Sequence, residues 1–331
     1  MTEMPGSVRL FAVLALGLVI TLVVVSSYIR LSHSGLGCQV WPQCYAHIGQ
    51  PRSSSALAQQ DSPGPPVQQP YSWAQPLHRS VASLLGVVVI ALLALAWIHR
   101  NHWRGGWRCL GITGLLFILT LGLALIGFYS GRLHNPAIVM ANLSGGILML
   151  VLLGWLVLAG TVRPRAGLFH ARLRRSAWIV LLLILVQIGL GGLTGANFAA
   201  TACTTFPDCH GQWLPDGQLL LALNLNRPIE VNSAGYALGG GERQAIHLAH
   251  RTGAWLLSIA LLMLALSAWQ RGLRAVGACL VVLLAAEMAV GITAIYMQLP
   301  IVLAVAHNWL AGLLLLCTLW LLALSRKPVD F

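Results

Sequence analysis

Three histidines lie near the ends of long hydrophobic segments of this sequence. His78 and His250 are each followed by arginine, in "PLHRSVASLLG" and "LAHRTGAWLLS", and His307 lies in "LPIVLAVAHNWLAG". A polar side chain in a bilayer is costly, so we expect each imidazole to face the interior of a helix bundle and to have a partner there. Imidazoles from two facing helices can hold a haem iron between them. The sequence therefore predicts that His250 and His307 ligate haem and that His78 is a further metal ligand. The alternative for each is an interhelical hydrogen bond.

Other polar residues lie beside these histidines. Arg79 and Arg251 would lie near the lipid headgroups, where a guanidinium can bind haem propionates through paired hydrogen bonds. His247 precedes His250 by one helical turn and either supports that ligand or contacts a substrate. Glu287, in "LLAAEMAVG", is the one acid that we place within the membrane, toward its inner half. It either bonds a neighbouring helix, which we favour, or supports proton movement.

Eight apolar segments must position these residues. The chain has 331 residues, of which 57% are hydrophobic and 8% charged, a composition typical of integral membrane proteins. Each segment is long enough to cross a hydrocarbon layer of about 30 Å, and must be helical because lipid offers no partners to backbone polar groups. We therefore predict an all-α integral membrane protein with transmembrane helices near 8–29, 77–98, 109–129, 137–159, 176–196, 245–268, 276–297 and 301–324.

The net charge of +12 is distributed in a way that indicates membrane topology. Most of the 20 Lys and Arg residues lie near the N-terminus, in the C-terminal tail and in the loops near 99–108, 160–175 and 269–275. All of these segments lie on one side of the membrane if successive loops alternate. The positive-inside rule places that side, and both termini, in the cytoplasm. We therefore expect contact with membrane lipid and not with nucleic acid.

An internal repeat divides the chain. Long outer loops follow the first and fifth segments, and each contains two cysteines separated by five residues, in "CQVWPQC" and "CTTFPDC". Each loop leads to a helix that opens with His-Arg, and the fourth helix of each half carries a polar residue, Asn142 in "NPAIVMANLSGG" or His307. This duplication predicts two pseudo-symmetric four-helix bundles, residues 1–160 and 161–331.

The cysteines divide by side of the membrane. Disulfides persist in oxidising compartments and are rare in the cytoplasm. The interpretation that we favour is two local disulfides that hold the outer loops, and the alternatives are redox-active thiol pairs or, less favoured, metal sites. The outer residues are Cys38, Cys44, Cys203 and Cys209, whereas Cys109, Cys279 and Cys317 are interpreted as packing residues.

Taken together, these motifs resemble the bacterial heme A synthase family over nearly the whole chain. The resemblance is carried by "RLSHSGLGCQVWPQC", the two His-Arg openings, "QIGLGGLTGANFAATACTTFPDCHGQWLP", "AIHLAHRTGAWLL" and "LPIVLAVAHNWLAG". It implies a bacterial inner-membrane enzyme whose C-terminal bundle holds haem b between His250 and His307. The N-terminal bundle would bind the substrate haem O and oxidise a ring methyl to a formyl group, with water as the oxygen source. The product, haem A, would go to terminal oxidases.

The resemblance also implies catalytic positions, at two of which this chain departs from the family. The N-terminal bundle of the family uses a histidine pair, of which His78 matches one member and Asn142 replaces the other. The family also carries a glutamate three residues before the first helix-opening histidine, where this chain has Gln75. An amide cannot accept a proton as a carboxylate can. Either the site works with one axial histidine, or the chain keeps haem b but has lost or changed its activity.

The implied partners follow from the same resemblance. They are haem O, the haem O synthase that makes it, quinone or another membrane electron acceptor, and the assembly machinery of terminal oxidases. Association of the chain with further copies of itself, as a homo-oligomer, is a further alternative. Two alternatives to an enzyme remain. One is a non-catalytic protein that binds haem b in haem handling or oxidase assembly, and the other is a b-type electron carrier.

Overall fold

The computed structural model describes residues 4–32, 73–103, 105–129, 135–162, 171–214, 218–226 and 240–326. Within these ranges, eight helices are long and apolar enough to cross a membrane, which confirms the eight predicted segments. Their bounds are α1 Gly6–Ser32, α3 Ala74–His99, α4 Gly106–Tyr129, α5 Pro136–Thr161, α6 Ala171–Ala196, α8 Gly241–Gln270, α9 Arg274–Tyr296 and α10 Ile301–Leu324. A short helix that the sequence analysis did not predict, α7 (Gln218–Ala222), packs on α8.

The fourth helix of each half begins beside a proline. Asn135 caps α5 by accepting a hydrogen bond of 2.8 Å from the backbone N–H of Ala137, and Pro136 occupies the first turn, where its missing N–H costs nothing. Pro300 immediately precedes α10. These starts place Asn142 and His307 one to two turns into their helices, at the same end of the molecule.

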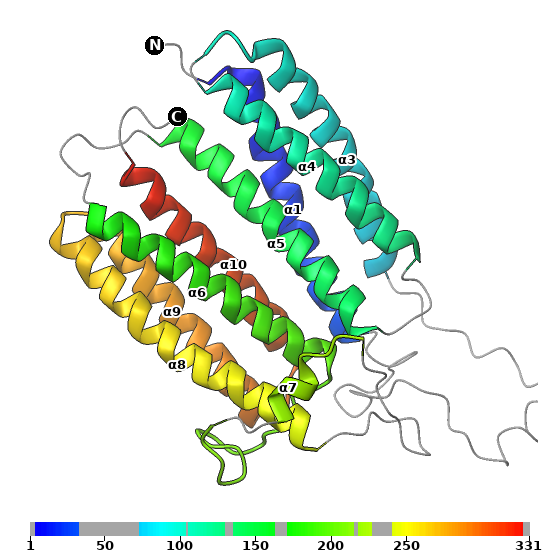
Figure 1. Ribbon diagram of the computed structural model, residues 1–331, viewed down its shortest axis with the longest axis vertical. Coiled ribbons are helices and arrows are strands. Elements are labelled where there is room, and N and C mark those ends of the chain that lie inside the picture. The colour runs from blue at the N-terminus through cyan, green and yellow to red at the C-terminus, as the bar shows by residue number, and fades with distance from the viewer. Residues whose placement is uncertain are drawn as a thin grey trace, which may run out of the picture.

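The long helices run side by side in two groups (Figure 1). In one group α1 contacts α3 and α5, and α4 also contacts both of them; in the other α6 contacts α8 and α10, and α9 also contacts both. Helices α1, α5, α6 and α10 also meet across the middle, through α1–α10, α5–α10 and α5–α6 contacts. The division near residue 160 and the pseudo-symmetry of the halves stay predictions, because these contacts join the two groups closely.

One apolar core runs through both groups of helices. It contains buried residues from every long helix, among them Leu92, Leu153, Leu264 and Leu315. Gly154 on α5 permits a close approach to α10, because a Cβ atom there would lie 2.6 Å from Leu316 Cδ2. Large apolar side chains also cover the outside of the helices, as a lipid-facing surface requires. Examples are Ile118, Leu182, Met263 and Val282.

The start of α1 and the end of α10 lie at one end of the molecule, and α7 lies at the other (Figure 1). Between α6 and α7, the chain forms a loop that contains the disulfide Cys203–Cys209, as predicted. The predicted partner pair, Cys38 and Cys44, lies outside the described residues. Cys109 and Cys317 are buried free thiols in the helices, and Cys279 is a half-buried one, in agreement with packing roles.

Candidate haem site

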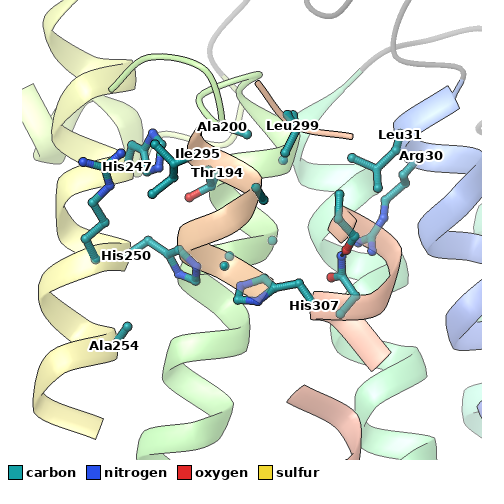
Figure 2. Close-up of a pocket in the computed structure, with 18 of the residues that line it drawn as sticks. Arg30, Leu31, Thr194, Ala200, His247, His250, Ala254, Ile295, Leu299 and His307 are labelled. Carbon is teal, nitrogen blue, oxygen red and sulfur yellow. Dashed lines mark hydrogen bonds between the residues drawn. The ribbon is translucent and has the colours of Figure 1, made fainter. Parts of the chain in front are cut away.

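A cavity of about 380 Å³ is lined by residues from both groups of helices. Residues from α1, α5, α6, α8, α9, α10 and the disulfide loop line it. Figure 2 shows His250 and His307 approaching one another from opposite sides of this space. The cavity thus brings together five of the eight residues predicted to bind or act on haem, and Glu287, which was not predicted there, also lines it. The five are Asn142, His247, His250, Arg251 and His307.

His250 on α8 and His307 on α10 face one another across the cavity. Their ring centroids are 6.2 Å apart and their planes meet at 88°. A metal–imidazole bond is about 2 Å long, and a ring centre lies about 1 Å beyond the ligating nitrogen, so two imidazoles on one metal have centres about 6 Å apart. The spacing of this pair therefore fits a single metal atom between the rings.

Helix α6 holds the imidazole of His250 in place. Nε2 of Gln187 lies 3.0 Å from Nδ1 of His250 and donates to the backbone carbonyl of His250 at 2.8 Å. One turn further along α6, Gly191 lies against the same ring, and a Cβ atom there would be 3.0 Å from Cε1. Gln187 is a residue of the site that was not predicted from the sequence. The available signal was an amide in the apolar run of a membrane helix, where it needs a partner.

Helix α9 holds His307 with an acid in place of the amide. Nδ1 of His307 lies 3.2 Å from Oε1 of Glu287, within hydrogen-bond distance, although the N–H does not point straight at the oxygen. The Glu287 side chain is only 13% exposed. Gly291, one turn later, lies against this ring as Gly191 does against His250, again with 3.0 Å from a Cβ atom to Cε1. Glu287 therefore contacts a neighbouring helix, which is the interpretation we favoured. Its predicted place toward the inner half was wrong, because it lies at the cavity beside His307.

Arg251 ties the disulfide loop to α8. Its Nη1 atom donates to the carbonyls of Thr205 and Asp208 at 2.6 and 2.7 Å, and its Nη2 atom donates to the carbonyl of Cys203 at 2.7 Å. Phe206 of this loop lines the cavity. Arg251 is 6% exposed, and within the described part of the chain its Nε has no hydrogen-bond partner. The predicted role with haem propionates stays a prediction. The loop carbonyls use three of the five N–H donors of the guanidinium, which leaves Nε–H and one Nη2–H.

Two polar residues of the N-terminal half reach the same cavity. Asn142 on α5 and Arg30 on α1 both line it, and Figure 2 shows Arg30 on the side opposite His250. The sequence analysis did not select Arg30, although an arginine at the end of an apolar span was a visible signal. His247 is 5% exposed and lines the cavity one turn before His250 on α8.

The other predicted N-terminal residues lie elsewhere. His78 is half-buried near the start of α3, whereas Gln75 and Arg79 are exposed. None of the three lines the cavity that holds His250 and His307. Their predicted roles with substrate and metal stay predictions.

The donor set of the cavity fits haem. Among the described residues, no group of three or more His, Cys, Asp or Glu side chains could hold a metal ion. A metal between His250 and His307 would therefore need further ligands, which the four nitrogens of a porphyrin supply. Flanking apolar residues suit a flat apolar ring: Phe206, Ala254, Trp255, Met288, Ile292 and Ile295.

The helices and this cavity define a class: a multi-pass membrane protein with a half-buried pair of facing histidines in a cavity. A family described as "Cytochrome oxidase assembly protein" matches residues 9–319, and the chain belongs to this family. A heme A synthase of Shewanella oneidensis is 33% identical over 316 residues, which cover 92% of this chain and 92% of the relative. Heme A synthases of Methylobacterium radiotolerans and Rhizorhabdus wittichii are each 28% identical, over 92% and 96% of this chain and 86% and 93% of the relatives.

Proposed function

We propose that this chain is a heme A synthase, which oxidises a ring methyl of haem O to a formyl group and so supplies haem A for oxidase assembly. The observation that carries this function is the facing pair His250 and His307, 6.2 Å apart, in a chain similar to heme A synthases over about nine-tenths of its length. The other features of the site support the same activity.

The cofactor of this enzyme is haem b, bound between His250 and His307. When bound there, haem b supplies one-electron transfer. Gln187 and Glu287 hold the two imidazoles from behind, and Gly191 and Gly291 leave space for the rings. The Nε of Arg251 and the guanidinium of Arg30 are the cationic groups at the cavity that suit the carboxylates of a haem.

The substrate haem O binds in the N-terminal half, with His78 as its axial ligand. Asn142 is on α5, a helix of this half, and its side of the helix lines the cavity proposed for haem b. Gln75, at the exposed start of α3, occupies the position of the catalytic carboxylate of the family. In our proposal the N-terminal site works with one axial histidine.

The membrane arrangement follows from the distribution of charge. The arginine-rich loops lie on the cytoplasmic side of a bacterial inner membrane. The cavity lies near the opposite, outer surface of that membrane. Electrons leave to quinone or another membrane acceptor, and haem O arrives from the haem O synthase. Both termini are cytoplasmic in this arrangement.

The second candidate is a protein that holds haem b without changing haem O. Gln75 and Asn142 favour it, because both departures from the family fall in the half that would perform the chemistry. A haem extraction separates the two functions. The chain is expressed in cells that make haem O but have no heme A synthase, and membrane haems are separated by chromatography and identified by mass. Haem A or its hydroxylated precursor supports the synthase, whereas haem O and haem B alone, with haem B in the purified protein, support the second candidate.

A further inference from the structure

We propose that Glu287 is a positioning residue that makes His307 a stronger electron donor to iron than His250. The inference rests on the proposed haem b site and concerns how that site is tuned. It starts from an arrangement of residues that occurs twice in the structure. Gln187 and Gly191 are four residues apart on α6, as are Glu287 and Gly291 on α9, so each pair lies on one face of its helix. In both cases the polar group reaches Nδ1 of a histidine, and the glycine lies against Cε1.

This arrangement fixes which nitrogen of each imidazole faces the cavity. With Nδ1 held from behind at 3.0 Å in His250 and at 3.2 Å in His307, Nε2 is the ring nitrogen left to bind iron. A hydrogen bond from Nδ1–H to a fixed acceptor orients a ligating imidazole and raises its basicity. The Glu287 contact is short enough for such a bond once the carboxylate rotates to meet the N–H.

The two partners differ in chemistry. The Gln187 amide carries both a donor and an acceptor, and its Nε2 also donates to the carbonyl of His250 at 2.8 Å. An amide nitrogen donates and does not accept, so in this geometry Gln187 offers no acceptor to an Nδ1–H of His250. A carboxylate only accepts, so Glu287 selects the tautomer of His307 with hydrogen on Nδ1 and a free Nε2. It also places negative charge behind that ligand. The axial pair is therefore asymmetric.

A bond between helices alone does not explain an acid at this position. An amide joins α6 to α8 without charge, whereas a carboxylate within a membrane helix is costly to bury. Oε2 of Glu287 is buried, and among the described residues it has no hydrogen-bond partner. A carboxylate in this position is an unfavourable choice for packing two helices together, but it suits a group whose charge acts on the ligand His307.

The test uses the full chain, purified with haem b, and the variants Glu287→Gln and Gln187→Glu. We would measure the haem b midpoint potential by optical titration, the low-spin EPR signal, and haem retention against a haem-binding competitor. Glu287→Gln should keep the bis-histidine signal with altered g-values, raise the midpoint potential and weaken haem retention about 10- to 100-fold. Gln187→Glu should lower the potential. The control is Glu242→Gln, which removes an acid in the first turn of α8 that does not line the cavity and should change none of the three measured quantities.

The outcomes separate this inference from the proposed function. If the wild-type chain binds no haem b, the proposed cofactor and this inference both fail. If the wild type is loaded but Glu287→Gln keeps the wild-type potential and EPR spectrum, only the inference fails, and Glu287 is a contact between helices. If Glu287→Gln does not accumulate, the Gln187→Glu variant decides. A lower midpoint potential supports the inference that a carboxylate at Nδ1 tunes the haem b ligand, and an unchanged midpoint potential overturns this inference.

Discussion

Gly191 on α6 leaves the space in which the imidazole of His250 on α8 lies. A Cβ atom at position 191 would be 3.0 Å from Cε1 of that ring, closer than side chains normally pack. Gly291 on α9 and His307 on α10 repeat this relationship at the same distance. Two glycines thus set how far each imidazole can lie from the helix behind it, and therefore how wide the gap between the two rings is.

Replacing Gly191 with alanine should weaken haem b binding. The new methyl group would push the His250 ring toward His307 and turn it away from Gln187, so we expect about tenfold lower haem retention and a shifted low-spin EPR signal. The matched control is Gly189→Ala on the same helix, where a Cβ atom meets nothing within 4 Å. Equal haem retention in the two variants would show that the glycine does not limit the position of the ring.

Removing either facing histidine should abolish the bis-histidine spectrum. In His250→Ala or His307→Ala, one axial ligand is lost from the 6.2 Å pair, and the purified chain should show either no haem b or a high-spin signal. The measurement is the optical and EPR spectrum of the purified protein. His99→Ala, at the far end of α3, serves as the control and should keep the wild-type spectrum. A low-spin bis-histidine signal that survives in either cavity variant would reject these ligands.

The eight helices could be predicted because a bilayer restricts which sequences and which secondary structures can cross it. An apolar run of about 20 residues in lipid can only be a helix, so hydropathy alone was sufficient. That His250 and His307 meet inside the bundle was also predictable, because polar residues in such runs are rare and need partners, and their role as haem ligands stays a prediction. Gln187 and Gly191 could not be assigned to the site in the same way. Their role depends on which face of α6 meets α8, and this rotation is set by packing between segments that are 63 residues apart.

The role of Arg251 shows a second limit of the sequence. Its place after His250 indicated a headgroup position and propionate binding, but the fold directs both Nη atoms to loop carbonyls of residues 203, 205 and 208. The loop's path depends on the disulfide Cys203–Cys209 and on packing against α8, neither of which local pattern determines. Helix α7 escaped prediction for a related reason, because five residues carry too little periodicity to identify a helix.

Replacing Arg251 with methionine should loosen the disulfide loop. The variant loses three charge-assisted hydrogen bonds and leaves three carbonyls without these donors, so we expect a loss of at least about 2 kcal/mol of local stability. Protease cleavage of the loop in the purified protein measures this opening, and the thermal transition should fall in parallel. Arg79→Met, at the repeat-related but exposed position on α3, is the control. Equal cleavage rates in both variants would contradict a structural role for Arg251.

Restoring the family residues at positions 75 and 142 should raise haem A formation. Gln75→Glu returns a group that can accept a proton, and Asn142→His returns an imidazole on α5. We expect the double variant to exceed the wild type in the ratio of haem A and its hydroxylated precursor to haem O, measured by haem extraction from cells without another heme A synthase. The control is Asn308→His, which adds an imidazole at a different lining position of the cavity, where the asparagine side chain now donates to the carbonyl of Ala304. A gain in the double variant but not in the control would show that the N-terminal half keeps a working substrate site. No gain in the double variant would mean that this half has been rebuilt around other residues.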